Sequence, residues 1–280
     1  MITNTFMPNS LVSQKDFKII ANFIKKYNGH CIDENQNSLI LNRLLPLVEK
    51  YDLNNLSQLV QRLKFSQFEE LHKDVAEKLA IHETFFFRDR KPFEKIKTHY
   101  LETIINKSNK TNFNIWCAAC STGQEAYSIA IMCHELKNKY KHKNLTFKIN
   151  ATDFSDSVLE KAKAGYYSQF DIQRGLTINE TIEYFDKVND NWIVKDFLKN
   201  LIKFEKLNLL ESFDDLHSYD LILCRNVLIY FDKLQKKEIL EKIVSLMGED
   251  SVLFLGVSET VVGIDVPLKY NESMVCYSKI

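Results

Sequence analysis

Two acidic side chains stand where an α/β protein would place ligand contacts. Glu125 closes the small-residue turn in Trp116–Glu125, and Asp153 comes directly after the strand-like run Phe147–Thr152. In open α/β sheets, ligands bind at the carboxyl ends of the strands, and an acidic residue after the second strand accepts hydrogen bonds from ribose hydroxyls. A carboxylate near the turn would suit a cationic ligand group. The alternatives are a simple tight turn at Glu125 and a helix N-cap at Asp153.

The turn before Glu125 lacks the glycine pattern of a dinucleotide site. Gly123 is its only glycine, which departs from G-x-G-x-x-G and argues against a pyrophosphate at the N-terminus of the next helix. Cys117 and Cys120 form a C-x-x-C, but Cys117 falls in a predicted buried strand and there is no second C-x-x-C. We therefore expect core cysteines rather than a redox pair or a metal site.

Two further polar pairs are candidate ligand contacts. Arg225 and Asn226 follow the nearly continuous apolar run Asp220–Cys224, which predicts a strand covered on both faces. Thr84 and Arg88 flank a Phe triplet and would share a face if that stretch were helical. Arginine is suited to bidentate recognition of a carboxylate. The alternatives are ordinary solvent exposure past the strand end, and a core triplet followed by a surface arginine.

Two kinds of structure must position these residues. Hydrophobic residues recur at helical spacing in the first part of the chain, which predicts a small helical bundle within an N-terminal domain of residues 1–90. From residue 91 to 280, strand-like and helical segments alternate, which predicts a parallel sheet with helices on both faces. An aromatic-rich stretch at about residues 166–205 interrupts this alternation. We interpret it as an insertion, either a small antiparallel sheet or a lid.

The composition excludes several classes of protein. The 280 residues are 45% hydrophobic and 26% charged, with 37 basic and 37 acidic side chains, so no global field favours nucleic acid or an anionic membrane. No apolar run approaches the about 18 residues of a membrane span. Met1–Ser10 has no basic region followed by an apolar core, and six cysteines are too few for a disulfide framework. We expect a cytoplasmic protein without membrane insertion.

Five ordered segments resemble the CheR-type chemotaxis receptor methyltransferases, which are S-adenosylmethionine-dependent protein-glutamate O-methyltransferases. The resemblance runs over nearly the whole chain and is carried by His82–Asp89, Ile115–Ser128, Ala151–Asp153, Leu207–Leu210 and Cys224–Asp232. It implies an α/β fold: a Rossmann-like methyltransferase sheet with an inserted small antiparallel β-subdomain, preceded by an all-α N-terminal domain. The methyltransferase domain would then span residues 91–280.

The resemblance also implies contacts to the cofactor, S-adenosylmethionine. Arg88 would reach its methionine carboxylate, Glu125 its amino group and Asp153 its ribose. Asn208–Leu209 and Asn226–Val227 would surround the adenine and the methionyl end. The complete implied set is His82, Thr84, Arg88, Gly123, Glu125, Asp153, Asn208, Leu209, Asn226 and Val227. Arg88, Asn226 and Tyr230 would position the reactants, and no residue is assigned an acid–base role.

Three positions depart from the family pattern. His82 stands where the family usually has Asn, Gln124 replaces a common Glu, and Val257 in the segment Gly256–Glu259 replaces a common His. In some members a glycine-rich loop of the β-subdomain binds a short peptide tethered to the receptor. The corresponding segment here, Asp186–Trp192, is short and has no glycine, so we predict that such a tether does not bind.

The acceptor chemistry explains why no catalytic base is found. A glutamate side chain has an ordinary pKa of about 4.3 and is already a carboxylate at neutral pH.

The implied function is the methylation of glutamates in the cytoplasmic helical region of chemotaxis receptors, which gives methyl esters for sensory adaptation. We expect the protein to be a monomer. Two alternatives stay open: a methyltransferase for RNA or a small molecule, and a cofactor-binding regulator or scaffold without turnover.

Overall fold

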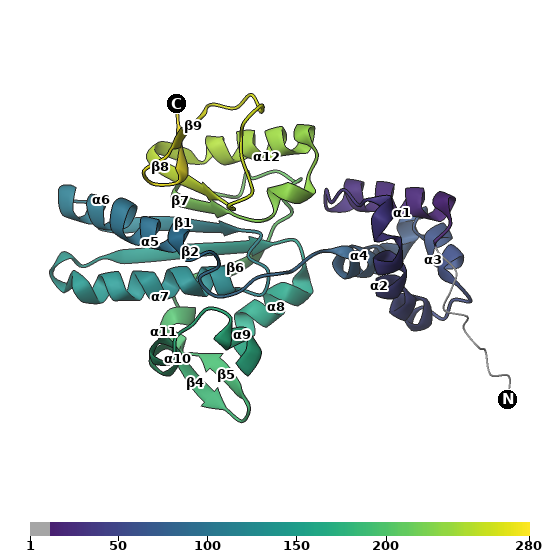
Figure 1. Cartoon of the computed structure of the whole chain (residues 1–280), viewed down its shortest axis with the longest axis horizontal. Helices are drawn as coiled ribbons and strands as arrows, with labels where there is room; N and C mark the ends of the chain where they lie inside the picture. Colours follow the sequence, from purple (N-terminus) through teal and green to yellow (C-terminus); the bar gives the residue numbers. More distant parts are fainter. Residues whose placement is uncertain (1–11) are drawn as a thin grey trace. The chain divides into compact units, whose positions relative to one another are not determined.

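The computed structural model describes residues 12–280, which form two compact units (Figure 1). The first unit runs to Ile81 and includes Tyr230–Asp232, and the second comprises His82–Ile229 and Lys233–Ile280. Met1–Ser10, which the sequence predicts to lack a secretory signal, lies outside the described residues. The boundary between the units, after Ile81, lies before the predicted boundary at residue 90. The segment between these two positions belongs to the second unit, because its Phe86 is fully buried in the core of that unit.

In the part of the first unit that the structure describes, there are four α-helices: α1 (Gln14–Tyr27), α2 (Asn37–Lys50), α3 (Leu56–Arg62) and α4 (Glu69–Leu79). Short 3₁₀ turns, η1 (Glu34–Gln36) and η2 (Ser66–Phe68), precede α2 and α4. The predicted apolar stripes are buried in this unit; they include Phe17, Ile20, Ile24, Leu44, Val48, Leu59, Val60, Leu71, Val75 and Leu79. The helical N-terminal region is therefore confirmed, and it is held by apolar burial.

A seven-stranded sheet forms the centre of the second unit, with the strand order β6-β2-β1-β7-β8-β10-β9. β10 runs antiparallel to both of its neighbours, whereas the pairs from β6 to β8 are parallel. The strands are β1 (Asn112–Ala118), β2 (Thr146–Asp153), β6 (Ile202–Lys206), β7 (Tyr219–Cys224), β8 (Met247–Leu255), β9 (Leu268–Asn271) and β10 (Cys276–Lys279).

Both faces of this sheet are covered. On one face, Ile115, Leu221 and Val252 share a core cluster with residues of α7 (Gln124–Lys139). Four other segments follow or flank the strands: α5 (Lys91–Lys95), the π-helical η3 (Ile96–Leu101), α6 (Glu102–Lys107) and α8 (Asp156–Ala164). On the other face, Trp116 packs edge-on against Phe213, whose ring lies 4.4 Å from Nζ of Lys242 in α12 (Lys233–Ser245). Successive side chains of a strand point to opposite faces, so the same strands bury side chains on both sides of the sheet. The predicted sheet with helices on both faces is confirmed.

The insertion is a three-stranded antiparallel sheet in the order β3-β5-β4, as predicted. It consists of β3 (Tyr166–Ser168), α9 (Gln169–Gln173), α10 (Ile178–Tyr184), β4 (Phe185–Val188), β5 (Asn191–Val194) and α11 (Asp196–Lys199). The predicted end of the insertion, at about residue 205, differs from the structure, because β6 pairs with β2 in the main sheet. A short strand next to an insertion has no periodicity that assigns it to one sheet or the other.

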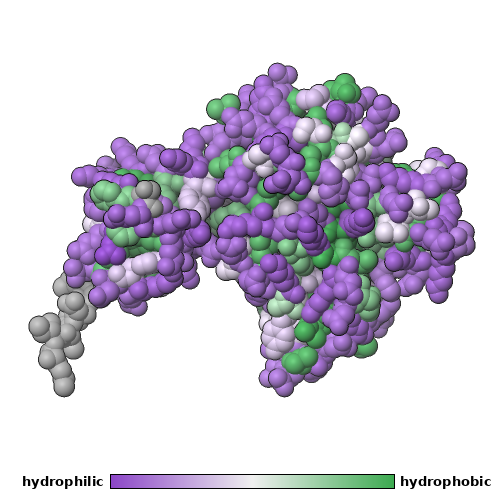
Figure 2. All heavy atoms as spheres, turned by 180° about the vertical axis from the view of Figure 1, so that it is seen from behind, coloured by the Kyte–Doolittle hydropathy of each residue, from purple (hydrophilic) through white to green (hydrophobic). Residues whose placement is uncertain are grey.

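The surface agrees with a charged content of 26%, which is ordinary for a globular protein. Figure 2 shows hydrophilic residues over most of the visible face, with hydrophobic residues between them. In residues 12–280, no helix has both the length and the apolar character needed to cross a membrane.

Candidate functional site

The strand order reverses at β1, which lies between β2 and β7. In a doubly wound sheet, a reversal of this kind opens a crevice at the carboxyl ends of the strands, where ligands bind. The loops after β1, β2, β6, β7 and β8 all start at this edge. They carry most of the residues that the sequence identifies.

The turn after β1 is shaped by three left-handed residues, Ala119, Ser121 and Gly123, with φ of 56°, 50° and 93°. Glycine tolerates such a conformation best. A Cβ on Gly123 would also lie 2.9 Å from Cβ of Ala162 in α8. Gly123 is therefore required by its backbone angle and by helix packing, whether or not a ligand approaches it.

Asp153 ends β2 and is almost completely buried, with 5% of its surface exposed. Its Oδ2 accepts a hydrogen bond from the N–H of Ser121 at 2.9 Å, and its Oδ1 accepts one from the N–H of Ser155 at 3.1 Å. Ser155, not Asp153, is the N-cap of α8, so the helix-cap alternative is wrong. Burial raises the pKa of Asp153, and backbone hydrogen bonds oppose the shift. A carboxylate has about four acceptor positions, so each oxygen can accept a further bond.

His82 lies beside this carboxylate. Its carbonyl oxygen accepts a hydrogen bond from the Ser121 hydroxyl at 2.9 Å, and its ring stacks on Phe154 with 6.2 Å between centroids. Among the described residues, Nε2 of His82 is buried without a hydrogen-bond partner. A buried polar atom without a partner is costly in a folded protein, and it fits a ligand group bound at this point.

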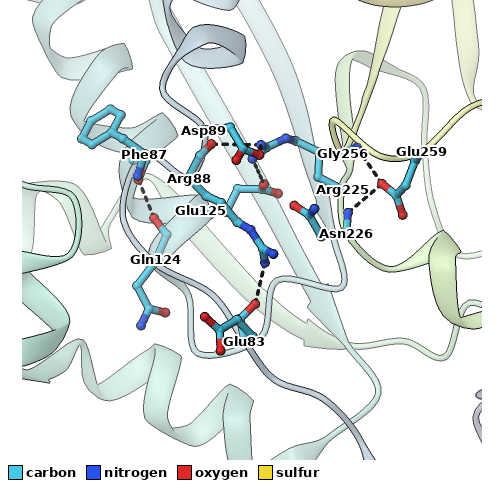
Figure 3. Close-up of polar contacts among 11 residues, drawn as sticks. Glu83, Phe87, Arg88, Asp89, Gln124, Glu125, Arg225, Asn226, Gly256 and Glu259 are labelled. Atoms are coloured by element: carbon cyan, nitrogen blue, oxygen red, sulfur yellow. Dashed lines mark hydrogen bonds and ion pairs between the residues drawn. The ribbon is translucent and has the colours of Figure 1, made fainter.

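The segment that carries Thr84 and Arg88 is not helical. Residues 82–85 have no regular structure and residues 86–89 form a turn, with left-handed φ at Phe87 and Asp89. The two side chains therefore do not share a helical face, because the turn departs from helical geometry. Nη1 of Arg88 donates to the carbonyl oxygen of Glu83 at 2.8 Å, and Figure 3 shows the side chain extended towards that carbonyl.

Arg225 ties two loops together from the end of β7. Its side chain is 0% exposed. Nη1 donates to Oε2 of Glu125 at 2.9 Å, while Nη2 donates to Oδ2 of Asp89 at 2.8 Å and to the carbonyl oxygen of Arg88 at 2.9 Å (Figure 3). Burial raises the pKa of Glu125, and the charge of Arg225 opposes the shift. The sequence singles out Arg225 beside Asn226, but the implied cofactor contacts omit it.

Glu259 holds the next loop and is also absent from the predicted set. Its Oε2 accepts hydrogen bonds from the N–H groups of Gly256 at 2.6 Å and of Asn226 at 2.7 Å (Figure 3). Its Oε1 accepts one from the N–H of Ile229 at 3.2 Å. Asn226 is thereby held at a φ of 59°. A Cβ on Gly256 would lie 2.7 Å from Nδ2 of Asn226. In the sequence, the motif Gly-x-Ser-Glu was the signal that could have identified Glu259. Its second residue, Val257, is 75% exposed.

The remaining candidate residues lie in the loop after β6, in the loop after β7 and in the first unit. Oδ1 of Asn208 accepts a hydrogen bond from the N–H of Leu210 at 3.1 Å in the loop after β6, where Leu209 is buried. Val227 is half-buried after Asn226. Tyr230 belongs to the first unit: its carbonyl oxygen accepts from the N–H of Cys31 at 2.8 Å, and its ring centroid lies 4.6 Å from that of His30.

The second unit matches one protein family over most of its length. The model of the CheR methyltransferase SAM-binding domain matches residues 82–275. The chain belongs to the CheR methyltransferase family. It is 36% identical to the chemotaxis protein methyltransferase Cher2 of Pseudomonas putida, over 89% of this chain and 91% of that protein. It is 37% identical to chemotaxis protein methyltransferase 1 of Pseudomonas aeruginosa, over 87% and 89% of the two chains. It is 33% identical to the chemotaxis protein methyltransferase of Borreliella burgdorferi, over 93% of this chain and 93% of that protein.

This CheR methyltransferase uses S-adenosylmethionine, so the predicted family, enzyme class and cofactor are confirmed. The charges at the sheet edge fit that cofactor. The cofactor carries a sulfonium, an ammonium and one carboxylate, and is therefore a net cation. The contacts described above involve two guanidinium groups and four carboxylates, namely those of Arg88, Arg225, Asp89, Glu125, Asp153 and Glu259.

The cysteine pair of this CheR methyltransferase is part of the core. Cys117 and Cys120 are buried free thiols, and burial raises the pKa of both well above its ordinary value. The reactive form of cysteine is the thiolate, so burial suppresses redox chemistry at this C-x-x-C.

Proposed function

We propose that this chain transfers the methyl group of S-adenosylmethionine to glutamate side chains in the cytoplasmic helical region of chemotaxis receptors. The similar proteins are named as chemotaxis protein methyltransferases, and the family resemblance implies the glutamate acceptor. The observation that carries the proposal is the group of carboxylates at the carboxyl edge of the sheet, where a cationic cofactor would bind.

In this proposal, Asp153 accepts hydrogen bonds from the two ribose hydroxyls. Each of its oxygens already accepts one backbone N–H, which fixes the carboxylate and leaves further acceptor positions. Glu125, held by Arg225, is the partner of the ammonium group. Arg88 uses one of its five N–H donors on Glu83 and retains donors for the methionine carboxylate.

The other implied contacts complete the pocket. His82 offers its buried Nε2 beside Asp153, and Thr84 approaches from the same segment. Gly123 brings backbone close to the cofactor at the turn after β1. Four residues of the loops after β6 and β7 would surround the adenine and the methionyl end: Asn208, Leu209, Asn226 and Val227.

Methyl transfer in this site needs orientation rather than a base. When bound, the cofactor supplies a methyl group on a sulfonium, from which a neutral thioether leaves. The acceptor glutamate is ionised at neutral pH, which agrees with the absence of an assigned acid–base residue. Arg88 and Asn226 would hold the methionyl end so that the acceptor approaches in line. In-line positioning is worth several kcal/mol in general, and exclusion of water from the acceptor carboxylate would add to it.

We further propose that the β-subdomain does not bind a receptor tether. β4 and β5 are joined by the two residues Asn189 and Asp190, with Asn189 at a φ of 55°. This tight hairpin offers no loop that could enclose a peptide. We also propose a cytoplasmic monomer.

The test is methyl transfer from labelled S-adenosylmethionine to membranes that contain chemotaxis receptors. We expect label on the receptor band that mild base releases as methanol, and no label on receptors whose acceptor glutamates are replaced by alanine. Asp153→Asn serves as the impaired variant. Label on RNA or on small molecules would identify a different acceptor. Cofactor binding without any transfer would identify a regulator and would refute the proposal.

A further inference from the structure

Arg225 is a fully buried cation that has no assigned part in cofactor binding. Its guanidinium carbon lies 5.3 Å from the centroid of the Phe93 ring, so one side of the group faces the core. Its two terminal nitrogens point to different loops, with Nη1 on Glu125 and Nη2 on Asp89. Such a charge is costly to bury unless it is paired with good geometry.

The two loops held by Arg225 carry two of the proposed methionyl contacts, Glu125 and Arg88. Glu125 lies in the first turn of α7 after β1. The other contact of Nη2 is the backbone carbonyl of Arg88, in the turn before α5. One planar fork at the end of β7 therefore sets the distance between an anionic side chain on one loop and a cationic residue on the other.

We propose that Arg225 is a positioning residue: it keeps Glu125 ionised and oriented for the cofactor ammonium, and it fixes Arg88 for the methionine carboxylate. The inference rests on the proposed roles of Glu125 and Arg88. Arg225 acts through these residues and has no direct contact with the reacting atoms. Lysine is a poor replacement because its ammonium is a point charge, whereas arginine presents its donors in a rigid fork.

The charges around Glu125 determine whether the loss of Arg225 raises or lowers the pKa of Glu125. Burial raises the pKa of Glu125, Arg225 lowers it most strongly, Glu259 raises it and Arg88 lowers it. The charge of Glu125 in turn contributes to the raised pKa of the buried thiols of Cys117 and Cys120. Removal of Arg225 takes away the group that lowers the pKa of Glu125 most, while burial and Glu259 still raise it. Glu125 then takes up a proton at a higher pH than in the unaltered protein and ceases to attract an ammonium.

The experiment compares the affinities of two ligands for the full-length protein by calorimetry. S-adenosylhomocysteine carries the ammonium and the carboxylate, whereas 5′-methylthioadenosine has the same nucleoside and thioether without either group. We expect Arg225→Gln to weaken the binding of S-adenosylhomocysteine about tenfold or more at neutral pH. The affinity for 5′-methylthioadenosine should stay within about twofold of that of the unaltered protein. The loss with S-adenosylhomocysteine should shrink as the pH rises, because Glu125 regains its charge.

Two further variants separate positioning from a structural role. Glu125→Gln removes the titrating group, so its affinity should be weak at every pH, and adding Arg225→Gln should cost less than it does in the unaltered protein. Arg225→Lys should recover part of the affinity for S-adenosylhomocysteine. Equal losses for both ligands would show a merely structural role and overturn the inference, as would unchanged binding of both. If the unaltered protein fails to bind S-adenosylhomocysteine, the proposed function fails instead.

Discussion

Replacement of Glu259 tests how the loops after β7 and β8 are held. In Glu259→Ala, three backbone N–H groups lose their acceptor, two of them at 2.6 and 2.7 Å and the third at 3.2 Å. A hydrogen bond to a charged group contributes about 1.5–3 kcal/mol. Glu259 is half-buried, so water replaces part of the loss. Taking the lower value for the two short bonds only, we expect about 3 kcal/mol, or about a hundredfold in the unfolding equilibrium.

The two tryptophans provide the assay. Trp116 and Trp192 both lie in the second unit, so their fluorescence follows the unfolding of that unit alone. For a domain of this size, the expected loss corresponds to a decrease in Tm of about 6–12 °C. Glu259→Gln retains a neutral acceptor, and charge-assisted bonds are roughly twice as strong as neutral ones, so about half the decrease is expected.

Affinity provides a second reading of the same variant. Asn226 needs its hydrogen bond to Glu259 to keep its left-handed backbone, so Glu259→Ala should also weaken S-adenosylhomocysteine. The matched control is Glu272→Ala, which removes an exposed carboxylate from the turn between β9 and β10. A Tm of Glu259→Ala within about 1 °C of the unaltered protein, with the same affinity, would show that this carboxylate does not hold the loops.

Three further results are expected. Asp153→Asn should weaken S-adenosylhomocysteine about ten- to a hundredfold by calorimetry, since one charged acceptor for the ribose is lost; equal affinity would contradict the proposed ribose contact. Gly256→Ala should destabilise the second unit by about 1–3 kcal/mol in urea, because its Cβ would lie 2.6 Å from Oε2 of Glu259; an unchanged midpoint would show that the loop relaxes freely. A receptor tether peptide should show no saturable binding at micromolar concentration, and a measurable isotherm would contradict the proposal for the β4–β5 hairpin.

The regular elements could be predicted because their signals are local. Apolar residues recur at helical spacing through α1 to α4, and they are the residues that the first unit buries. The apolar run of β7 predicted a strand covered on both faces, and Leu221, Ile222 and Leu223 are each fully buried. The end of the insertion was harder to place, since the partner of β6 is β2, which lies about fifty residues earlier in the chain.

The candidate site could be predicted only in part. Asp153 and Glu125 could be proposed as ligand contacts because strand ends are recognisable in the sequence and a carboxylate there has a chemical meaning. Thr84 and Arg88 would have shared a face only in a helix, and that condition is not met, because the backbone is left-handed at Phe87 and Asp89, a conformation that the sequence signals only weakly in non-glycine residues. Arg225 was noticed as a polar residue past a strand, but its role was not predictable.

The sequence by itself determined which residue types occupy the strand ends, where the apolar stripes lie and which family the motifs resemble. These properties depend on neighbours in the chain, so they can be seen without coordinates. Only the tertiary structure decided that Arg225 pairs with Glu125 and Asp89, a hundred or more positions away, and that Glu259 holds Asn226. Such pairs depend on the strand order of the sheet, which brings loops together that are remote in sequence. Burial then makes each pairing necessary, because an unpaired charge or N–H group inside the protein is costly.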